Sequence, residues 1–290
     1  MNGILLVDKP AGWTSSDVVA KLRGVLHEKR IGHSGTLDPM ATGLLVVLVG
    51  RATRAASFAE AQDKRYLAGL RLGLVTDTQD VTGTAFERHE VTITTETLRE
   101  ALTRFTGEIE QVPPMYSAIK VKGQKLYQIA RRGGEVERAA RSVTVSALEL
   151  VGREGEDWLL DVRCSKGTYV RTLCHDVGAA LGCGGCMSAL RRLAAGDYRV
   201  DEAHTLPEII AAAEAGRAEE YLLPLDGLFA GYPALTADTE AERRIRCGNS
   251  AAAEAADGTY RVYAESGEFL ALCRAEEGRL ITIKSFFEVS

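Results

Sequence analysis

A glycine-containing loop, followed four residues later by an uninterrupted apolar run, is the feature that most limits what this chain can fold into. Residues 32–39 read Gly-His-Ser-Gly-Thr-Leu-Asp-Pro, and residues 44–49 are all apolar. A short apolar run between turn signals is typical of a buried strand. Because glycines allow unusual backbone angles and Pro39 disfavours helical geometry at Asp38, the loop should hold one carboxylate on a stiff turn beside that strand. An Asp-Pro dipeptide is also common in turns with only a structural role.

The length and composition predict a globular protein with one large domain and a small appendage. The chain has 290 residues, of which 46% are hydrophobic. No apolar stretch approaches the roughly 20 residues that cross a bilayer, and the first residues do not resemble a signal peptide, so we expect a cytoplasmic protein without membrane contact. Six cysteines at irregular spacing predict reduced thiols rather than a disulfide framework.

The charge is distributed unevenly along the chain. The net charge is −5, but residues 201–290 carry 17 acidic and 8 basic side chains, whereas residues 1–200 carry 27 basic and 23 acidic ones. Residues 120–141 alone contain seven basic and two acidic side chains. This segment predicts either a phosphate-facing patch or an ordinary solvated surface.

Apolar periodicity and turn residues predict alternating strands and helices, and therefore a mixed α/β core. Strands are expected at residues 3–7, 44–49, 66–74, 117–121, 143–151 and 158–164. Helices are expected from a cap at Ser15 or Ser16 to about residue 28, and over residues 94–105, 124–132, 166–181 and 206–215. After a turn at residues 224–227, β-prone runs at 259–263, 269–273 and 280–283 predict a small β-rich unit.

Six motifs in order resemble the bacterial tRNA pseudouridine synthase B family along essentially the whole chain. They are GHSGTLDPMATGLL at 32–45, DKPAG at 8–12, KRY at 64–66, PMYSAIK at 114–120, GTYVRTL at 167–173 and LRR at 190–192. The resemblance implies an α+β catalytic domain at residues 1–228, built on a mostly antiparallel sheet flanked by helices. It also implies a basic RNA-binding insertion at about 112–141 and a small PUA-like β-barrel at 229–290.

The same resemblance implies that the protein isomerises uridine to pseudouridine at position 55 in the T-loop of tRNA, without cofactor or metal. The uracil leaves as a stabilised anion and must be recaptured, so one ionised carboxylate in a closed pocket suffices. Asp38 matches that catalytic carboxylate, and either attack on C1′ or removal of the C2′ proton is open to it. Arg171 matches the arginine that pairs with this carboxylate and should lower its pKa, although a purely structural salt bridge is the alternative. Tyr66 matches the tyrosine that stacks on the flipped base and that the resemblance also connects with proton transfer at C5 late in the reaction, although a core tyrosine is the alternative.

Further residues match family positions that bind RNA. His33 should help to open the T-loop, or else brace its own loop by a hydrogen bond. Tyr169 and Leu190 match residues that line the base pocket. Structural roles and phosphate contacts are both open for Lys9 and Lys64. The basic insertion should close on the T-arm and neutralise phosphates through five side chains, namely Lys120, Lys122, Lys125, Arg131 and Arg132.

The partner implied by the resemblance is tRNA, contacted at the T-arm and, through the C-terminal unit, at the acceptor stem. No periodic apolar face marks a dimer surface, so we expect a monomer without an obligate protein partner.

Two positions depart from the family pattern, and two other interpretations of the chain follow from the residues. Ser34 stands where threonine is usual, and Cys186 stands where histidine is more usual. Cys183 and Cys186 form a Cys-x-x-Cys pair, which suggests zinc or redox chemistry, but a structural zinc site needs four ligands and no second pair exists. A non-catalytic RNA-binding protein or tRNA chaperone of the same fold is the other alternative.

Overall fold

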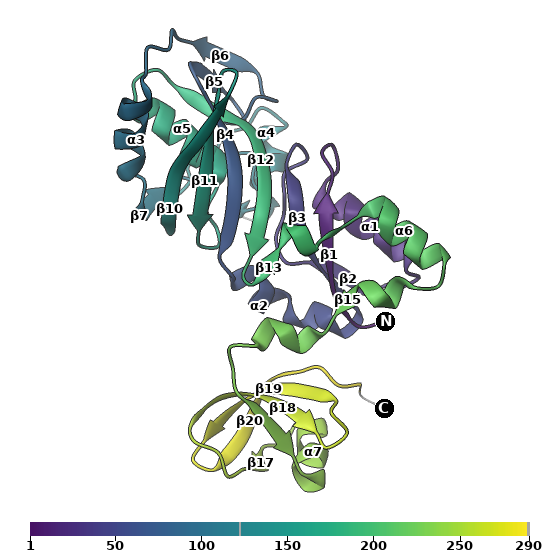
Figure 1. The fold of residues 1–290 in the computed structure, drawn as a ribbon. Helices are drawn as coiled ribbons and strands as arrows, with labels where there is room; N and C mark the ends of the chain where they lie inside the picture. Colours follow the sequence, from purple (N-terminus) through teal and green to yellow (C-terminus); the bar gives the residue numbers. More distant parts are fainter. Residues whose placement is uncertain (122, 289–290) are drawn as a thin grey trace.

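A long, mostly antiparallel sheet forms the body of the molecule (Figure 1). The computed structural model describes residues 1–121 and 123–288. The sheet has 11 strands, and only the pairs β1–β14 and β3–β12 are parallel. The expected α+β class is therefore confirmed. In spatial order its main path is β14 (His204–Thr205), β1 (Gly3–Lys9), β3 (Thr42–Val49), β12 (Gly185–Ala195), β4 (Lys64–Leu72), β11 (Asp157–Cys164), β10 (Arg141–Glu154) and β7 (Gly107–Gln111).

Strand β3 is apolar throughout because both of its faces are covered. Leu45 and Val47 pack under the helices α1 (Ser15–Val25) and α6 (Leu206–Glu214), which lie side by side in Figure 1. Leu44 and Val46 face the opposite side and pack toward the 3₁₀ helix Leu225–Phe229. A strand buried on both sides cannot alternate apolar and polar residues, which explains the continuous run in the sequence.

The other half of the sheet carries the helices α3 (Thr95–Thr103) and α5 (Val170–Ala180) on one face. Leu98 of α3 and Leu173 of α5 share a buried cluster with Leu70 of β4 and Leu160 of β11. This packing places the start of α5 beside the centre of the sheet. Among the described residues, no helix is long and apolar enough to cross a membrane.

Helix α1 begins one or two residues earlier than the sequence predicted. Its cap is Thr14, whose side chain accepts from the Asp17 backbone N–H while the Asp17 carboxylate accepts from the Thr14 N–H. The expected cap at Ser15 or Ser16 is thus wrong. The reason is that the Ser15 hydroxyl has another partner, since it accepts from the Leu37 N–H at 2.8 Å.

Strand β12 was not expected from the sequence, although it lies between β3 and β4 at the centre of the sheet. It starts with glycine and contains the pair Arg191 and Arg192, so its residues do not show the pattern of a buried strand. Two further pairs of strands stand apart from the main path: β5 (Leu74–Thr76) with β6 (Ala85–Arg88), and β8 (Lys120–Val121) with β9 (Gln124–Lys125).

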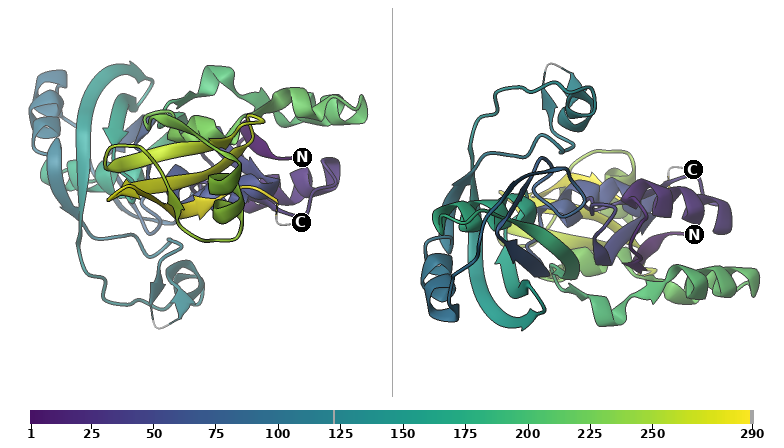
Figure 2. Two further views of the ribbon diagram at one scale, coloured as in Figure 1. Left: turned by 90° about the horizontal axis from the view of Figure 1, so that it is seen from below. Right: turned by 90° about the horizontal axis from the view of Figure 1, so that it is seen from above.

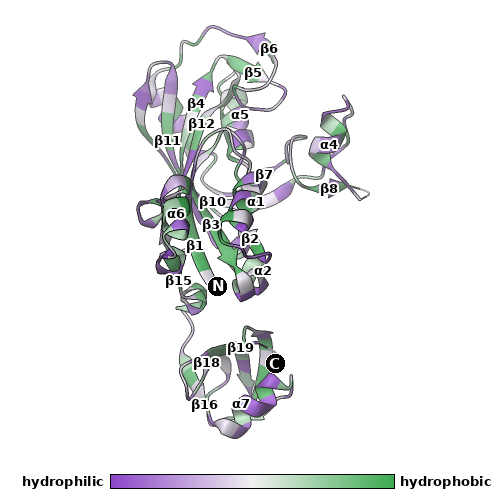
Figure 3. Ribbon diagram, turned by 90° about the vertical axis from the view of Figure 1, so that its right-hand side faces the viewer, coloured by the Kyte–Doolittle hydropathy of each residue, from purple (hydrophilic) through white to green (hydrophobic). Residues whose placement is uncertain are grey.

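The insertion stands away from the sheet, as the ribbons of Figures 2 and 3 show for α4 and β8. Helix α4 covers only Leu126–Ala130, so the predicted helix at 124–132 is shorter than expected. The predicted strand at 117–121 is reduced to the two residues of β8. Lys122 lies outside the described residues.

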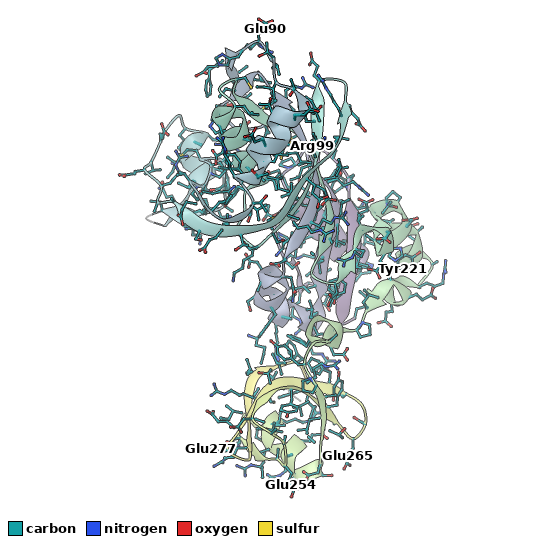
Figure 4. All side chains as sticks on the ribbon, turned by 60° about the vertical axis from the view of Figure 1, so that its left-hand side comes forward. Glu90, Arg99, Tyr221, Glu254, Glu265 and Glu277 are labelled. Atoms are coloured by element: carbon teal, nitrogen blue, oxygen red, sulfur yellow. The ribbon has the colours of Figure 1, made fainter. Side chains whose placement is uncertain are left out.

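The C-terminal part forms a second, five-stranded sheet in the order β16 (Ala234–Ala237), β18 (Gly258–Ala264), β19 (Phe269–Glu276), β20 (Arg279–Ser285) and β17 (Ala251–Ala252), with α7 (Thr239–Arg246) beside it. Phe229 connects the catalytic part to the second sheet, since its ring contacts Phe58 of α2 (Ala56–Ala61) and Phe269 of β19. The expected boundary after residue 228 falls within this connection. Glu254, Glu265 and Glu277 are exposed on the outer side of this unit (Figure 4).

Candidate active site

The loop that carries Asp38 is fixed to the body from two sides. The Lys9 ammonium donates to the Pro39 carbonyl at 3.3 Å, and the Ser15 hydroxyl bonds to the Leu37 backbone. The Gly12 N–H also donates to Pro39, at 2.7 Å. The Asp38 side chain remains 34% exposed. A rigid loop therefore presents one carboxylate whose surface is still open to a ligand.

Arg171 holds the Asp38 carboxylate with two donors. Its Nε lies 2.8 Å from Oδ2, and its Nη2 donates to Oδ1 at 3.3 Å. Nη1 donates to the Thr78 carbonyl at 3.0 Å, and Nη2 also donates to the Tyr116 carbonyl at 2.8 Å. The arginine side chain is only 6% exposed. The ion pair expected from the sequence is thus present, and the guanidinium has no freedom to turn away from the carboxylate.

A second carboxylate, Asp80, lies near Arg171 and was not predicted. Its Oδ2 is 3.9 Å from the Arg171 Nη1, and its side chain is 7% exposed. Its Oδ1 accepts from the Thr78 hydroxyl and the Thr82 N–H, both at 2.9 Å. The polar run DTQDVTGT at 77–84, directly after a strand, is the signal in the sequence that could have drawn attention to it.

The net pKa of Asp38 is raised rather than lowered. Burial disfavours its charged form and is the largest influence, and the charge of Asp80 acts in the same direction. Arg171 does lower this pKa, as the sequence suggested, but burial outweighs the arginine. The expected net direction is therefore corrected, and the carboxylate is more basic than an ordinary aspartate.

Tyr66 lies on β4 and is 9% exposed. It shares the buried cluster of the sheet with Leu37 of the loop and with Leu190 of β12. Burial raises the pKa of its phenol, whereas the charge of Arg192 acts in the opposite direction. The structure thus brings the ring and the Asp38 loop to one place, and a base-stacking role for the ring stays a prediction.

Tyr169 and Leu190 border the same region. Tyr169 directly precedes α5, and its backbone N–H donates to the Gln111 side chain at 3.0 Å. Burial raises the pKa of its phenol, and the charges of Arg171 and Asp38 also act on it. Leu190 is 8% exposed and lies opposite Ala68 of β4. Their contact with a base stays a prediction.

Lys9 and Lys64 are buried, which favours the structural alternative for both. The Lys9 ammonium donates to the carbonyls of Pro10, Trp13 and Pro39. The Lys64 ammonium donates to the carbonyls of Glu60 and Gln62. Burial lowers the pKa of each lysine to about 8. Neither ammonium is turned toward solvent, where a phosphate would meet it.

His33 ends β2 (Ile31–His33), which pairs with β3. Its Nδ1 accepts from the Gly35 N–H at 3.3 Å, so the ring braces its own loop. Burial lowers the pKa of the imidazole, which favours its neutral form. The ring is half-buried, and a contact with RNA stays a prediction.

The basic side chains of the insertion face solvent. Lys120, Arg131 and Arg132 are exposed, and Lys125 is half-buried. Lys125 and Arg131 lie over the Tyr127 ring, at 5.6 and 5.4 Å from its centroid. Lys122 is outside the described residues.

Cys183 and Cys186 are both buried and form no disulfide. Burial raises the pKa of the Cys186 thiol to about 11. This disfavours loss of the proton, whereas a cysteine binds metals as the deprotonated thiolate. Within residues 1–121 and 123–288, no group of three His, Cys, Asp or Glu side chains is arranged to hold a metal ion.

Comparisons with known proteins match nearly the whole chain. A model of the TruB family pseudouridylate synthase N-terminal domain matches residues 23–170, and a model of the tRNA pseudouridylate synthase B C-terminal domain matches residues 171–230. The tRNA pseudouridine synthase B of Clostridium kluyveri is 40% identical over 99% of this chain and 100% of its own length. That of Azoarcus sp. is 44% identical over 97% of this chain and 93% of its own.

A solved structure shares the fold over nearly the whole chain. A chain in the crystal structure of a Cbf5-Nop10-Gar1 complex superposes with a TM-score of 0.76 at 26% identity, covering 99% of this chain and 85% of the other.

Proposed function

The chain belongs to the TruB family of pseudouridine synthases, and from this premise we propose that it converts uridine 55 in the T-loop of tRNA to pseudouridine. That the chain is an enzyme which forms pseudouridine in tRNA follows from its family and from relatives that match it over nearly their full length. The position of the uridine and the chemical route belong to the proposal.

One observation carries the chemical part of the proposal: a single open carboxylate held in place by a buried arginine. Asp38 is 34% exposed and paired with Arg171, whereas the nearby Asp80 is 7% exposed and engaged by its own loop. Glycoside hydrolases place two carboxylates around the sugar, one of which activates water or attacks the sugar. With one accessible carboxylate, the site favours cleavage and re-formation of the glycosidic bond over hydrolysis.

In the proposed reaction the target nucleotide leaves its loop and the base enters the pocket beside Tyr66. Asp38 acts on the ribose, either by attack on C1′ or by removal of the C2′ proton, while the C1′–N1 bond breaks. The freed uracil turns and C1′ binds to C5. Stacking on Tyr66 offsets part of the cost of flipping, since base stacking contributes about 1 to 3 kcal/mol.

The partner in this proposal is the T-arm of tRNA, recognised by shape and backbone charge. The exposed basic side chains of the insertion, Lys120, Arg131 and Arg132, support it. Contact of the C-terminal unit with the acceptor stem, a monomeric state, a cytoplasmic location and the absence of a cofactor stay predictions.

The test is incubation of the purified protein with an unmodified tRNA transcript, followed by chemical mapping of pseudouridine. We expect one modified position, residue 55, without added metal or cofactor and in the presence of a chelator. A transcript with cytidine at position 55 is the matched control and should remain unmodified. Modification at another uridine would contradict the substrate assignment, and no modification of any tRNA would contradict the enzymatic one.

A further inference from the structure

Arg192 is a buried charge at the centre of the sheet. It belongs to β12, where it is paired in register with Gly43 of β3 and Tyr66 of β4, and it is 3% exposed. None of the ion pairs among the described residues includes it. A buried guanidinium without a carboxylate is costly unless hydrogen bonds or a bound group stabilise its charge. The groups around the Arg192 guanidinium therefore indicate what this buried charge does.

The guanidinium of Arg192 joins the two ends of the loop that carries Asp38. Its Nε donates at 2.6 Å to the carbonyl of Leu44, which follows the loop in the chain. Its Nη2 donates at 3.3 Å to the carbonyl of Gly35, which precedes Asp38. The two strands also approach closely here, since a Cβ on Gly43 would lie 2.4 Å from the Arg192 carbonyl oxygen. The Arg192 side chain thus attaches both ends of the Asp38 loop to strand β12 of the sheet.

The same side chain faces Tyr66. The two residues are directly opposite in the antiparallel pair of β12 and β4, and such pairs place their side chains on one face with Cβ atoms about 5 Å apart. Both side chains are buried. Burial raises the pKa of the Tyr66 phenol, and Arg192 opposes that effect through its positive charge.

We infer that Arg192 is a positioning residue of the isomerisation, which joins the ends of the Asp38 loop and provides the positive charge that stabilises the Tyr66 phenolate before this phenolate removes the C5 proton. The inference rests on the proposed function. It adds a residue and a role that the ion pair of Asp38 and Arg171 does not supply.

The proton transfer that Arg192 would assist is balanced in atoms and charge. After the C1′–C5 bond forms, C5 still carries its hydrogen. The Tyr66 phenolate takes this proton, the electron pair of the C5–H bond returns to the ring, and the phenol results. N1 of the turned base takes a proton from solvent, and the phenol returns one to solvent. The base has lost one proton and gained one, so the reaction remains an isomerisation.

Among the described groups that surround the Tyr66 phenol and the guanidinium, Arg192 is the permanent positive charge. Burial lowers the pKa of both neighbouring lysines to about 8 and lowers that of the histidine, whereas arginine stays protonated at all accessible pH values. The lysines are Lys9 of β1 and Lys64 of β4, and the histidine is His33 of β2. The other two groups are the Cys164 thiol of β11 and the Asp38 carboxylate of the loop.

The first test measures the Tyr66 phenol without any turnover. The protein is prepared with 3-fluorotyrosine at its nine tyrosines, the signal of residue 66 is assigned with Tyr66→Phe, and its pKa is followed by fluorine NMR. We expect Arg192→Met to raise this pKa by about one unit or more, and Arg192→Lys to restore most of the difference. Arg191→Met is the matched control, because Arg191 is the adjacent residue and pairs with Asp8 instead. An unchanged pKa in Arg192→Met would overturn the inference.

The second test uses tRNA with deuterium at C5 of its uridines in single-turnover reactions. We expect Arg192→Met to slow product formation by at least about tenfold and to increase the deuterium isotope effect relative to the wild type, because removal of the C5 proton becomes limiting. A slower Arg192→Met with the wild-type isotope effect would assign Arg192 to loop structure alone and overturn the inference. If the wild type modified no tRNA, the proposed function would fail instead, whereas the phenol titration would still be readable.

Discussion

The Asp38 loop and the basic insertion hold their charged side chains in opposite ways. Asp38 is fixed by Arg171, and its neighbours Leu37 and Pro39 are tied to α1 and β1. The basic side chains of the insertion are largely exposed and stand on short elements away from the sheet. The difference shows where rigidity is needed: the group that reacts must keep its geometry, whereas the groups that meet phosphates need reach and charge.

Arg171 connects the two regions. The same guanidinium that binds the Asp38 carboxylate donates to the carbonyl of Tyr116 at 2.8 Å, near the start of the insertion. Some substitutions should therefore affect only one of the two regions and others should affect both, with effects that differ in size and in kind.

Arg171→Met should give the largest loss, because it releases the carboxylate and the base of the insertion together. We expect the single-turnover rate to fall by about a hundredfold or more, since small displacements of a reacting group have effects of this size. Arg71→Met is the control, because Arg71 forms a more exposed pair with Glu156 and Asp157 at the far end of β4. Quenched single-turnover assays measure the rate of both variants. An equal loss of rate in the two would show that the ion pair of Arg171 with Asp38 has no special role.

Neutralising the insertion should weaken tRNA binding and leave the chemical step intact. In a triple variant, Lys120, Arg131 and Arg132 are changed to glutamine. The slope of log affinity against log salt should then become shallower by about 0.7 to 0.9 for each phosphate that the insertion no longer neutralises, while the rate with saturating tRNA stays near that of the wild type. A loss of rate at saturation would contradict the division between the two regions.

The matched control for this triple variant removes three arginines from the acidic C-terminal third. Arg217, Arg243 and Arg274 are each paired with a glutamate, with side chains 60%, 67% and 57% exposed. Changing these three to glutamine should change the salt slope less than the insertion variant does, because a glutamate already neutralises each arginine. Equal changes in both triple variants would assign binding to overall charge rather than to the insertion.

The smallest effect concerns pH. Because burial raises the pKa of Asp38, the active carboxylate should be lost at a higher pH than that of an ordinary aspartate as the solution is acidified. In a plot of rate against pH, this loss gives an acid limb in which the rate falls as the pH is lowered. Asp80→Asn removes a like charge beside Asp38 and should move the acid limb to lower pH, by about one unit or less. Asp77→Asn in the same loop is the control and should leave the limb in place. A limb that moves upward in Asp80→Asn would contradict the assignment of the pKa shift.

The sequence was sufficient where a feature is local. The apolar run of β3, the helix α1 and the stiff turn at Asp38 all depend on neighbouring residues, and each is present. The pairing of Arg171 with Asp38 came from the family resemblance, since the two residues are 133 positions apart.

The sequence was insufficient where a role depends on distant strands. The position of Arg192 opposite Tyr66 follows from the register of β12 with β4, and β12 itself was not recognised. The contact of Asp80 with Arg171 requires a loop from one half of the sheet to meet a helix from another part of the chain. Burial also decides between the structural and phosphate-binding roles that the sequence left open for Lys9, because its ammonium donates to three carbonyls.

The central claim is that the Asp38 carboxylate carries out the isomerisation on tRNA that is bound by other residues. Asp38→Asn keeps nearly the same volume and removes the charge. The most direct measurement therefore follows both tRNA affinity and pseudouridine formation in this variant. We expect affinity close to that of the wild type and no detectable pseudouridine. Turnover at the wild-type rate in Asp38→Asn would contradict the claim.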